Sequence, residues 1–377
     1  MRDILAERLL AKVMNWENDE ISRERPFLQA MAAFKYDEYQ QFAPGMKFIE
    51  SLAMWLSQFE KLEERRVAYE FIKNRLIFIS SAEMTHLVSI AYPDYIKPLL
   101  IKKIAREADY PEYMISKIVN SKQFKVLRRQ SLFLGLSDGA RIDVFRRSSK
   151  ELSHEQIWPI YDISGDRAQE MIEKLKKDLS KYLSGAQLEE VCKFRAIFLL
   201  DDFSASGLSY LRKEGDKYKG KIYRFYRKMI HPEGELRSII SDDAMVYVIL
   251  YVATDKAKEH IEQMMDELFE ENKNDEFEYG VRVIQQIGDE CRVGELEIDK
   301  EFVNKLIDKY YDSRIQDEHT DVGGTKDLKF GFAGCALPVV LHHNTPNNSI
   351  ALLWSYDDED IEIRGLFPRV RRHGVRV

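Results

Sequence analysis

The chain has 377 residues, of which 45% are hydrophobic and 32% are charged, and its formal net charge is −7. This composition describes a soluble globular protein that is long enough for two domains. The longest apolar run, Met245 to Ala253, is too short to cross a bilayer, and the first residues lack a signal-peptide core. We therefore expect a cytoplasmic protein with no membrane partner.

Three cysteines lie far apart in the sequence, at Cys192, Cys291 and Cys335, with no CxxC pair. This spacing fits a reducing compartment and argues against a zinc module or a disulfide framework. The charge is unevenly distributed, because residues 61–150 are basic on balance whereas the remainder is acidic. Such a basic stretch is either a nucleic-acid surface or the solvated face of a helical domain.

The first 130 or so residues predict helices. Apolar residues recur at helical spacing from Phe48 to Leu62, and Ser80-Ser-Ala-Glu83 is a capping box that starts another helix. Tyr92-Pro93-Asp94 is expected to break that helix. A basic helix follows from about residue 96 to 108, and a further short helix begins near Glu112.

These short helices with proline breaks are compatible with a winged-helix or helix-turn-helix unit over residues 78–130. Many helical bundles share the pattern. If nucleic acid binds the basic region 97–129, the side chains expected to contact phosphate are Lys117, Lys122, Lys125, Arg128 and Arg129.

The pattern changes near Gly135, and we expect a domain boundary close to 133: a helical domain over 1–133 and an α/β domain over 134–377. Residues 140–145 alternate like a strand that ends in Arg146 and Arg147. Guanidinium groups at a strand end either bind a diphosphate or form an exposed basic edge.

The remainder alternates strands with helices. Strands are predicted at 196–200, 245–252, 279–287, 336–341 and 350–354, with helices at 166–183, 255–271 and 299–316 between them. This alternation predicts a mostly parallel, doubly wound sheet with helices on both faces. The expected fold is therefore α/β, preceded by an all-helical domain.

The most informative stretch is the end of the strand at 196–200. Two carboxylates, Asp201 and Asp202, are followed by a loop of small and hydroxyl residues and then by a helical pattern. Ligands of open α/β sheets bind at the carboxyl ends of strands, and a small-residue loop entering a helix can hold phosphate. The carboxylates suit ribose hydroxyls, a nearby Mg²⁺ ion or positive charge in a transition state. The alternative is an ordinary Ser/Gly turn and helix cap.

A second polar loop, residues 342–348, follows the predicted strand at 336–341. His343 and Asn344 could hydrogen-bond a base, a diphosphate or a leaving group if this loop reaches the same crevice. The alternative is plain turn chemistry. No spaced third ligand accompanies the two histidines, so we expect no resident metal site there.

The stretch Asp201-Asp202-Phe-Ser-Ala-Ser206-Gly207 resembles the phosphoribosyl-diphosphate (PRPP) motif of type I phosphoribosyltransferases. The resemblance implies that Asp201 and Asp202 are the catalytic pair that faces the ribose. It also implies that the 5-phosphate is held by the loop residues Ser204, Ala205, Ser206, Gly207, Leu208 and Ser209. Ser206 stands where the family usually has Thr, and Leu208 where many members have a second Gly.

Three segments, 143–147, 200–207 and 337–348, together resemble phosphoribosyltransferase-like proteins of bacterial phage-defence loci, including those beside retron reverse transcriptases. The resemblance implies an effector that binds PRPP or a nucleotide, with Mg²⁺ as cofactor and a defence-complex protein as a possible partner.

Three functions stay open from the sequence. The chain is an enzyme acting on a ribose-1 bond, a nucleotide-sensing regulator whose helical domain binds nucleic acid, or an interaction module with a degenerate site. No general base for an incoming nucleophile is evident.

Overall fold

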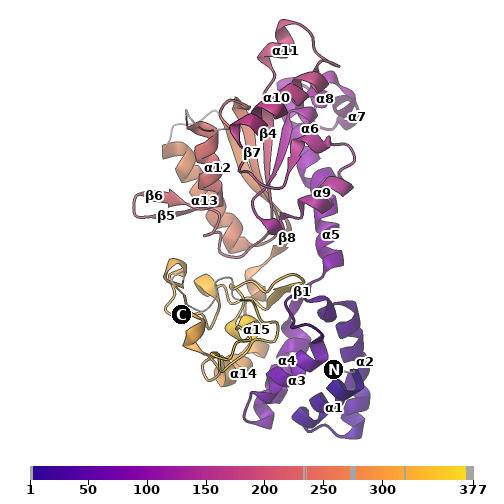
Figure 1. The fold of residues 1–377 in the computed structure, drawn as a ribbon, viewed down its shortest axis with the longest axis vertical. Helices are drawn as coiled ribbons and strands as arrows, with labels where there is room; N and C mark the ends of the chain where they lie inside the picture. The colour runs from indigo at the N-terminus through magenta and orange to yellow at the C-terminus, as the bar shows by residue number, and fades with distance from the viewer. Residues whose placement is uncertain (1–2, 232–233, 235, 272–276, 318–319, 371–377) are drawn as a thin grey trace. The chain divides into compact units, whose positions relative to one another are not determined.

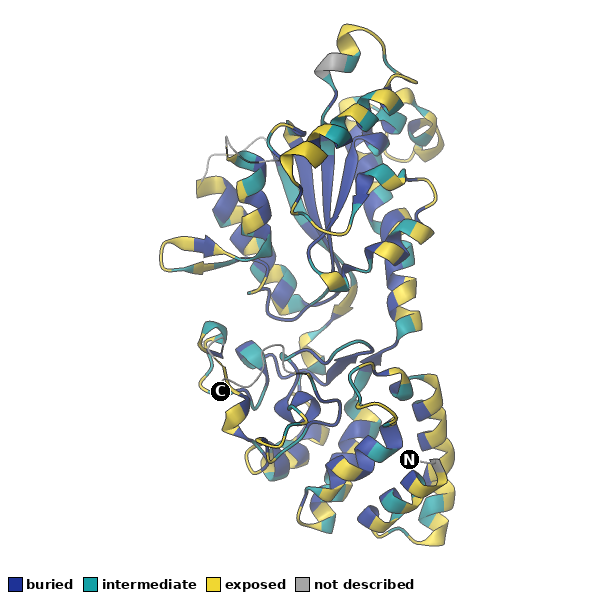
Figure 2. Cartoon of the chain, viewed as in Figure 1, coloured by how far each residue is buried: buried dark blue, intermediate teal, exposed yellow. Residues whose placement is uncertain are grey.

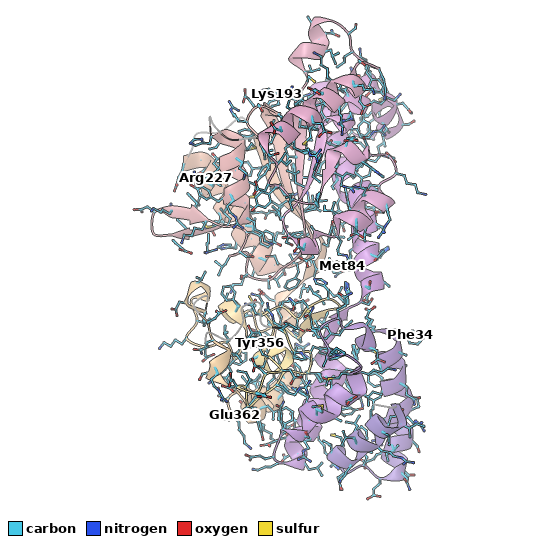
Figure 3. All side chains as sticks on the ribbon, viewed as in Figure 1. Phe34, Met84, Lys193, Arg227, Tyr356 and Glu362 are labelled. Atoms are coloured by element: carbon cyan, nitrogen blue, oxygen red, sulfur yellow. The ribbon has the colours of Figure 1, made fainter. Side chains whose placement is uncertain are left out.

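The chain divides into two compact units in a computed structural model that describes residues 3–231, 234, 236–271, 277–317 and 320–370. The split unit combines Met1–Met84 with Gly288–Val377, and the sheet unit is the continuous segment Thr85–Ile287. Met84, labelled in Figure 3, ends the first segment of the split unit.

This division differs from the boundary expected near residue 133. Strand β2, Ser131–Gly135, is an inner strand of the main sheet, and the helices before it belong to the same compact unit. Conversely, the C-terminal segment does not extend the main sheet: its strand β9, Val339–Leu341, pairs with β1, Ile77–Ile79. Both facts are set by long-range pairing, which a local change of pattern does not reveal.

The sheet unit is built on five parallel strands in the order β3-β2-β4-β7-β8, of which β4, β7 and β8 are labelled in Figure 1. The strands other than β2 are β3 Ile157–Trp158, β4 Phe194–Ser204, β7 Ile240–Thr254 and β8 Glu278–Ile287. The inner strands are buried along most of their length, whereas the helices around them show exposed outer faces (Figure 2). The near-continuous apolar runs of these strands are typical of a parallel sheet that is covered on both sides.

Alternate side chains of the central strands pack on opposite layers, as strand geometry requires. Leu132, Leu134, Ile197 and Leu199 share one core with three helices. These helices are α10 Gly165–Leu179, α12 Lys221–Ile230 and α13 Asp255–Glu271.

The opposite face of the sheet is aromatic. Phe133 stacks on Phe198 at 5.3 Å between ring centroids, and it also contacts Phe145 and Tyr92. These partners come from α9, Ile142–Ser148, and from the π-helical turn Ala91–Ile96. Helices therefore cover both faces, which confirms the predicted doubly wound α/β fold.

The helices that precede β2 begin as one continuous rod, and the last two of them follow a non-helical stretch at 108–114 and pack against that rod. They are α5 Ser81–Ile90, the π turn Ala91–Ile96, α6 Lys97–Glu107, α7 Ile115–Asn120 and α8 Lys122–Arg129. The capping box at Ser80 and Glu83 is present, with both reciprocal hydrogen bonds formed. Pro93 does not break the rod as expected, because the wide turn accommodates a residue without an amide hydrogen.

The split unit combines N-terminal helices with the C-terminal segment around one core. Its helices are α1 Asp3–Met14, α2 Asn18–Phe34, α3 Phe48–Ser57, α4 Leu62–Arg75, α14 Lys300–Phe302 and α15 Ala351–Trp354. Trp55 of α3 donates a hydrogen bond of 2.8 Å to the carbonyl of Leu352, so the two segments are joined within the core. The region expected to be all helical thus also contains β1.

Three predicted elements are wrong in type. Residues 140–145 form a 3₁₀ turn and the start of α9, because Ile142 and Phe145 face the sheet at helical spacing. Over six residues, strand and helix periodicities overlap. Residues 350–354 form α15, and the helix expected over 299–316 breaks into α14, the π turn Val303–Ile307 and a 3₁₀ turn.

Throughout the described part of the chain, no helix combines the length and the apolar character that crossing a membrane requires.

A buried carboxylate of the split unit gives its stability a pH dependence. Burial raises the pKa of Glu64, but hydrogen bonds from Lys309 and Tyr310 outweigh burial and lower the pKa from 4.5 to about 2. This stabilisation is therefore complete above pH 4.5 and is lost as the pH falls towards 2. We expect Glu64→Gln to lose roughly 3 kcal/mol of unfolding free energy at pH 7 and much less at about pH 3, measured by urea unfolding.

Glu70 on the same helix is the matched control, because its side chain is 58% exposed. Glu70→Gln should change stability by less than about 0.5 kcal/mol at both pH values. A Glu64→Gln loss that is equal at both pH values would contradict the assignment.

Candidate functional site

The order of the strands reverses between β2 and β4. From β2 the chain passes to β3 on one side, and it then returns to β4, β7 and β8 on the other side (Figure 1). The segments that leave the carboxyl ends of β2 and β4 therefore diverge. Such a switch point is where open α/β sheets bind ligands.

The two predicted carboxylates lie at this point, on β4 itself. The strand extends to Ser204, beyond the predicted end at residue 200, and Asp201 pairs in register with Leu250 of β7. Adjacent residues of a strand point to opposite faces. Accordingly, Asp201 is 0% exposed whereas Asp202 is partly exposed.

Asp201 is the centre of a buried hydrogen-bond network. Its Oδ1 accepts a hydrogen bond from the Ser137 hydroxyl, and its Oδ2 accepts from Tyr210 at 2.7 Å and from Lys221 Nζ at 2.6 Å. Burial raises the pKa of Asp201, with a further contribution from the neighbouring charge of Asp202, while Lys221 opposes both. The network ties the β2 loop, the segment after β4 and α12 together.

Asp202 lies against the loop that leaves β2. Its Oδ1 accepts a hydrogen bond of 2.9 Å from the amide of Phe203. A Cβ atom at Gly139 would stand 2.3 Å from Asp202 Oδ2, so any larger residue there would displace the Asp202 side chain. This close approach brings the backbone of the β2 loop beside the carboxylate.

The segment 204–209 differs in part from the expected phosphate loop. Ser204 is the last residue of β4, and Ala205 and Ser206 are buried. The segment does not enter a helix directly: the hairpin β5 Arg212–Glu214 and β6 Lys217–Lys219 comes first, and α12 begins only at Lys221. A turn inside the segment is closed by a hydrogen bond of 2.9 Å from the Tyr210 amide to the Gly207 carbonyl.

The segment is fastened to the start of α13. Thr254 donates a hydrogen bond of 2.6 Å to the carbonyl of Ala205 and accepts one from the amide of Ala257. Leu208 is partly buried and Ser209 is exposed, so the far end of the turn is open to solvent. The structure thus presents Leu208 and Ser209 as the accessible part of the predicted phosphate site.

We expect Gly207→Ala to destabilise the sheet unit by roughly 1–3 kcal/mol. Gly207 has φ of +75°, and a Cβ there would meet His260 Cδ2 at 2.7 Å and the Ala257 carbonyl at 3.0 Å. Gly215 is the matched control, because its φ is +59° but nothing lies within 4 Å of its Cβ position. Thermal unfolding of Gly207→Ala and Gly215→Ala separates the steric clash with α13 from the backbone strain that both variants share. Equal losses of stability would mean that the clash with α13 contributes nothing.

Comparison with protein families gives a match to the PRTase-CE family over residues 52–369. The chain belongs to the PRTase-CE family. The match covers the sheet unit and most of the split unit, and it supports a phosphoribosyltransferase-like protein with a nucleotide or PRPP as the class of substrate. Neither the curated proteins nor the solved structures contain a match to the chain.

Arg146 and Arg147 of this PRTase-CE chain lie on α9, not at a strand end. Arg146 donates to the carbonyl of Ile157 at 2.7 Å, and Arg147 forms an exposed ion pair with Asp143 at 2.9 Å. The Arg146 contact joins α9 to β3, and the Arg147 pair lies within α9. Binding of a diphosphate by either guanidinium stays a prediction.

His343 and Asn344 belong to the split unit, whereas the acidic pair belongs to the sheet unit. The His343 carbonyl accepts from Gln41 at 3.0 Å, and the Asn344 amide donates to the Leu341 carbonyl at 3.0 Å. Both residues thus shape the turn after β9. A role in the substrate site is not supported by these contacts and stays a prediction.

The basic region 97–129 is neutralised in part inside the sheet unit, and among the described residues Lys117, Lys122 and Lys125 form no ion pair. Lys97 pairs with Glu151 at 2.8 Å, Arg106 with Glu278 at 2.9 Å and Arg129 with Asp178 at 2.8 Å. Cations that are already paired are poorly prepared to contact nucleic-acid phosphates. The helices also pack in one unit with the sheet, so a separate winged helix stays a prediction.

Four residues of the candidate site were not anticipated from the sequence: Ser137, Gly139, Tyr210 and Lys221. Ser137 and Gly139 follow the apolar run that ends at Leu136, so the strand-end rule applied to Asp201 could have found them. Lys221 has no such signal, because a hairpin separates it from the acidic pair.

Among the described residues, no three or more His, Cys, Asp or Glu side chains are grouped so as to hold a metal ion.

Proposed function

We propose that the sheet unit binds a phosphoribosyl ligand, PRPP or a nucleotide, at the switch point between β2 and β4. The single observation that supports this is the partly exposed carboxylate of Asp202 beside the backbone of Gly139, at the diverging ends of two parallel strands. Asp202 would accept hydrogen bonds from the ribose hydroxyls. The turn Gly207–Ser209 would receive the 5-phosphate.

The chemistry of such a ligand is substitution at the anomeric carbon of the ribose. The bond from this carbon to the diphosphate or base breaks, and the leaving group takes the electron pair. A nucleophile then forms the new bond. The reaction passes through an oxocarbenium-like state, which the negative charge of Asp202 would stabilise.

The residues present fit Mg²⁺ only together with a diphosphate. Mg²⁺ is commonly held by one or two carboxylates plus substrate phosphates rather than by an all-protein cage. Asp202 is a partly exposed carboxylate of this kind, whereas Asp201 is enclosed by its own partners. When bound, Mg²⁺ would neutralise the charge of the departing diphosphate.

The decisive experiment is isothermal titration of the full chain with PRPP and Mg²⁺, followed by a search for released diphosphate. Saturable binding with slow diphosphate release would support an enzyme. A nucleotide that binds is also incubated with the chain and tested for release of its base. Binding of PRPP or of a nucleotide with no release of diphosphate or base would favour a sensor. If PRPP, ribose 5-phosphate and nucleoside monophosphates all fail to bind, the proposal is wrong.

The resemblance to phage-defence effectors extends the proposal to an effector that depletes a nucleotide-type metabolite when its partner is disturbed. The metabolite pool after expression of the wild-type chain, compared with that after expression of Asp202→Asn, tests this role without a guess at the substrate. Identical pools would contradict it.

A further inference from the structure

The acidic pair is asymmetric in a way that the PRPP motif does not explain. Both oxygens of Asp201 are occupied: Oδ1 by the Ser137 hydroxyl and the Asp202 amide, and Oδ2 by Tyr210 and Lys221. A carboxylate offers about four lone-pair sites. With four donors and no exposed surface, Asp201 has no site left for a ribose hydroxyl.

Two cations lie beside the open turn: Arg212, whose Nη1 donates a hydrogen bond of 3.2 Å to the carbonyl of Leu208, and Lys221, which begins α12. The Lys221 amide donates a hydrogen bond of 3.1 Å to the carbonyl of Ser209, which places the start of α12 directly beside that turn. Its Nζ lies 4.8 Å from the centroid of the Tyr210 ring, and its side chain is 22% exposed. An ammonium group has three donors, so the contact with Asp201 leaves donors for an anion.

We infer that Lys221 binds the phosphate of the phosphoribosyl ligand and that Asp201 is a positioning residue for its ammonium group, which leaves the ribose hydroxyls to Asp202. The inference rests on the proposed function and assigns the two acidic residues to different tasks. The negative charge of Asp201 then holds the Lys221 ammonium group in place, and Asp202 contacts the sugar. Tyr210 and Ser137 keep the Asp201 carboxylate in place.

The inference is tested by titrating the full chain with ribose 5-phosphate at pH 7.5 and pH 5.5. A phosphate monoester gains its second negative charge with a pKa near 6, so a contact with a cation is stronger at the higher pH. We expect Lys221→Gln to weaken binding roughly 10–100-fold at about pH 7.5 and clearly less at about pH 5.5. Lys221→Arg should retain most of the affinity.

Asp201→Asn should show the same pH-dependent pattern with a smaller loss, because Lys221 remains but is no longer held by a charge. Lys213→Gln is the matched control: Lys213 lies on the neighbouring hairpin and pairs with Glu271 at 2.7 Å. This variant should bind as the wild type does. If Asp201→Asn fails to fold, the Lys221→Gln and Lys221→Arg pair still decides.

The outcomes separate the two proposals. Wild-type binding that Lys221→Gln leaves unchanged, or weakens equally at both pH values, would overturn the inference and leave the proposed function standing. If the wild type binds none of ribose 5-phosphate, PRPP and nucleoside monophosphates, the proposed function fails and the inference fails with it.

Discussion

Replacing Asp202 by asparagine is expected to weaken PRPP binding at least tenfold, with little change in thermal stability. Hydrogen bonds to a charged group contribute about 1.5–3 kcal/mol, which corresponds to roughly 10–100-fold in affinity. The amide oxygen of Asn can still accept from the Phe203 amide, so the strand end is preserved. Removing this charge also relieves the repulsion that raises the pKa of Asp201. Isothermal titration with PRPP and Mg²⁺ gives the affinity.

Asp216→Asn is the matched control for this variant. Asp216 is exposed on the turn between β5 and β6, so its substitution should change neither affinity nor stability. If Asp202→Asn binds PRPP as the wild type does, Asp202 does not contact the ligand. If it unfolds at a clearly lower temperature, its role is structural.

Replacing Phe198 by alanine is expected to remove roughly 3–5 kcal/mol of unfolding free energy from the sheet unit. Phe198 is fully buried on the central strand β4, where its ring stacks between Phe133 of β2 and Tyr247 of β7. Truncation leaves a cavity on the face of the sheet. The cavity cannot collapse, because β4 is held by backbone hydrogen bonds to β2 and β7. Denaturant unfolding followed by far-ultraviolet circular dichroism measures the loss.

Tyr113 in the same unit provides the comparison, because 79% of it is exposed. Tyr113→Ala should stay within about 0.5 kcal/mol of the wild type. A loss below about 1 kcal/mol for Phe198→Ala would mean that this face of the sheet repacks around the gap.

The sequence was sufficient for the central fold where strands were long and apolar. The runs at 196–200, 245–252 and 279–287 all lie in the parallel sheet, and the helix at 255–271 has the predicted bounds. Short elements were harder, because a stretch such as 140–145 fits two periodicities equally well. Strand β1 has only three residues, too few to show any period.

For the candidate site, the sequence placed both carboxylates at a strand end but could not show which of them is enclosed. Asp201 and Asp202 are identical side chains at adjacent positions, and only the direction of the strand decides which of them is enclosed. The partners that enclose Asp201 come from positions 137, 210 and 221. Their proximity depends on strand pairing and on the hairpin, neither of which is visible in a local motif.

The division of the chain has a consequence for its synthesis. The sheet unit is one continuous stretch, so on the ribosome it can fold as soon as residue 287 has emerged. The N-terminal helices are made first but must wait for the last segment, since residues such as Leu352, Leu366 and Phe367 complete their core. Until then, an apolar surface around Trp55 stays uncovered. A chain that stops short of residue 367 would therefore combine a folded sheet unit with N-terminal helices whose apolar surface is exposed. Chaperones and proteases recognise such exposed apolar surface.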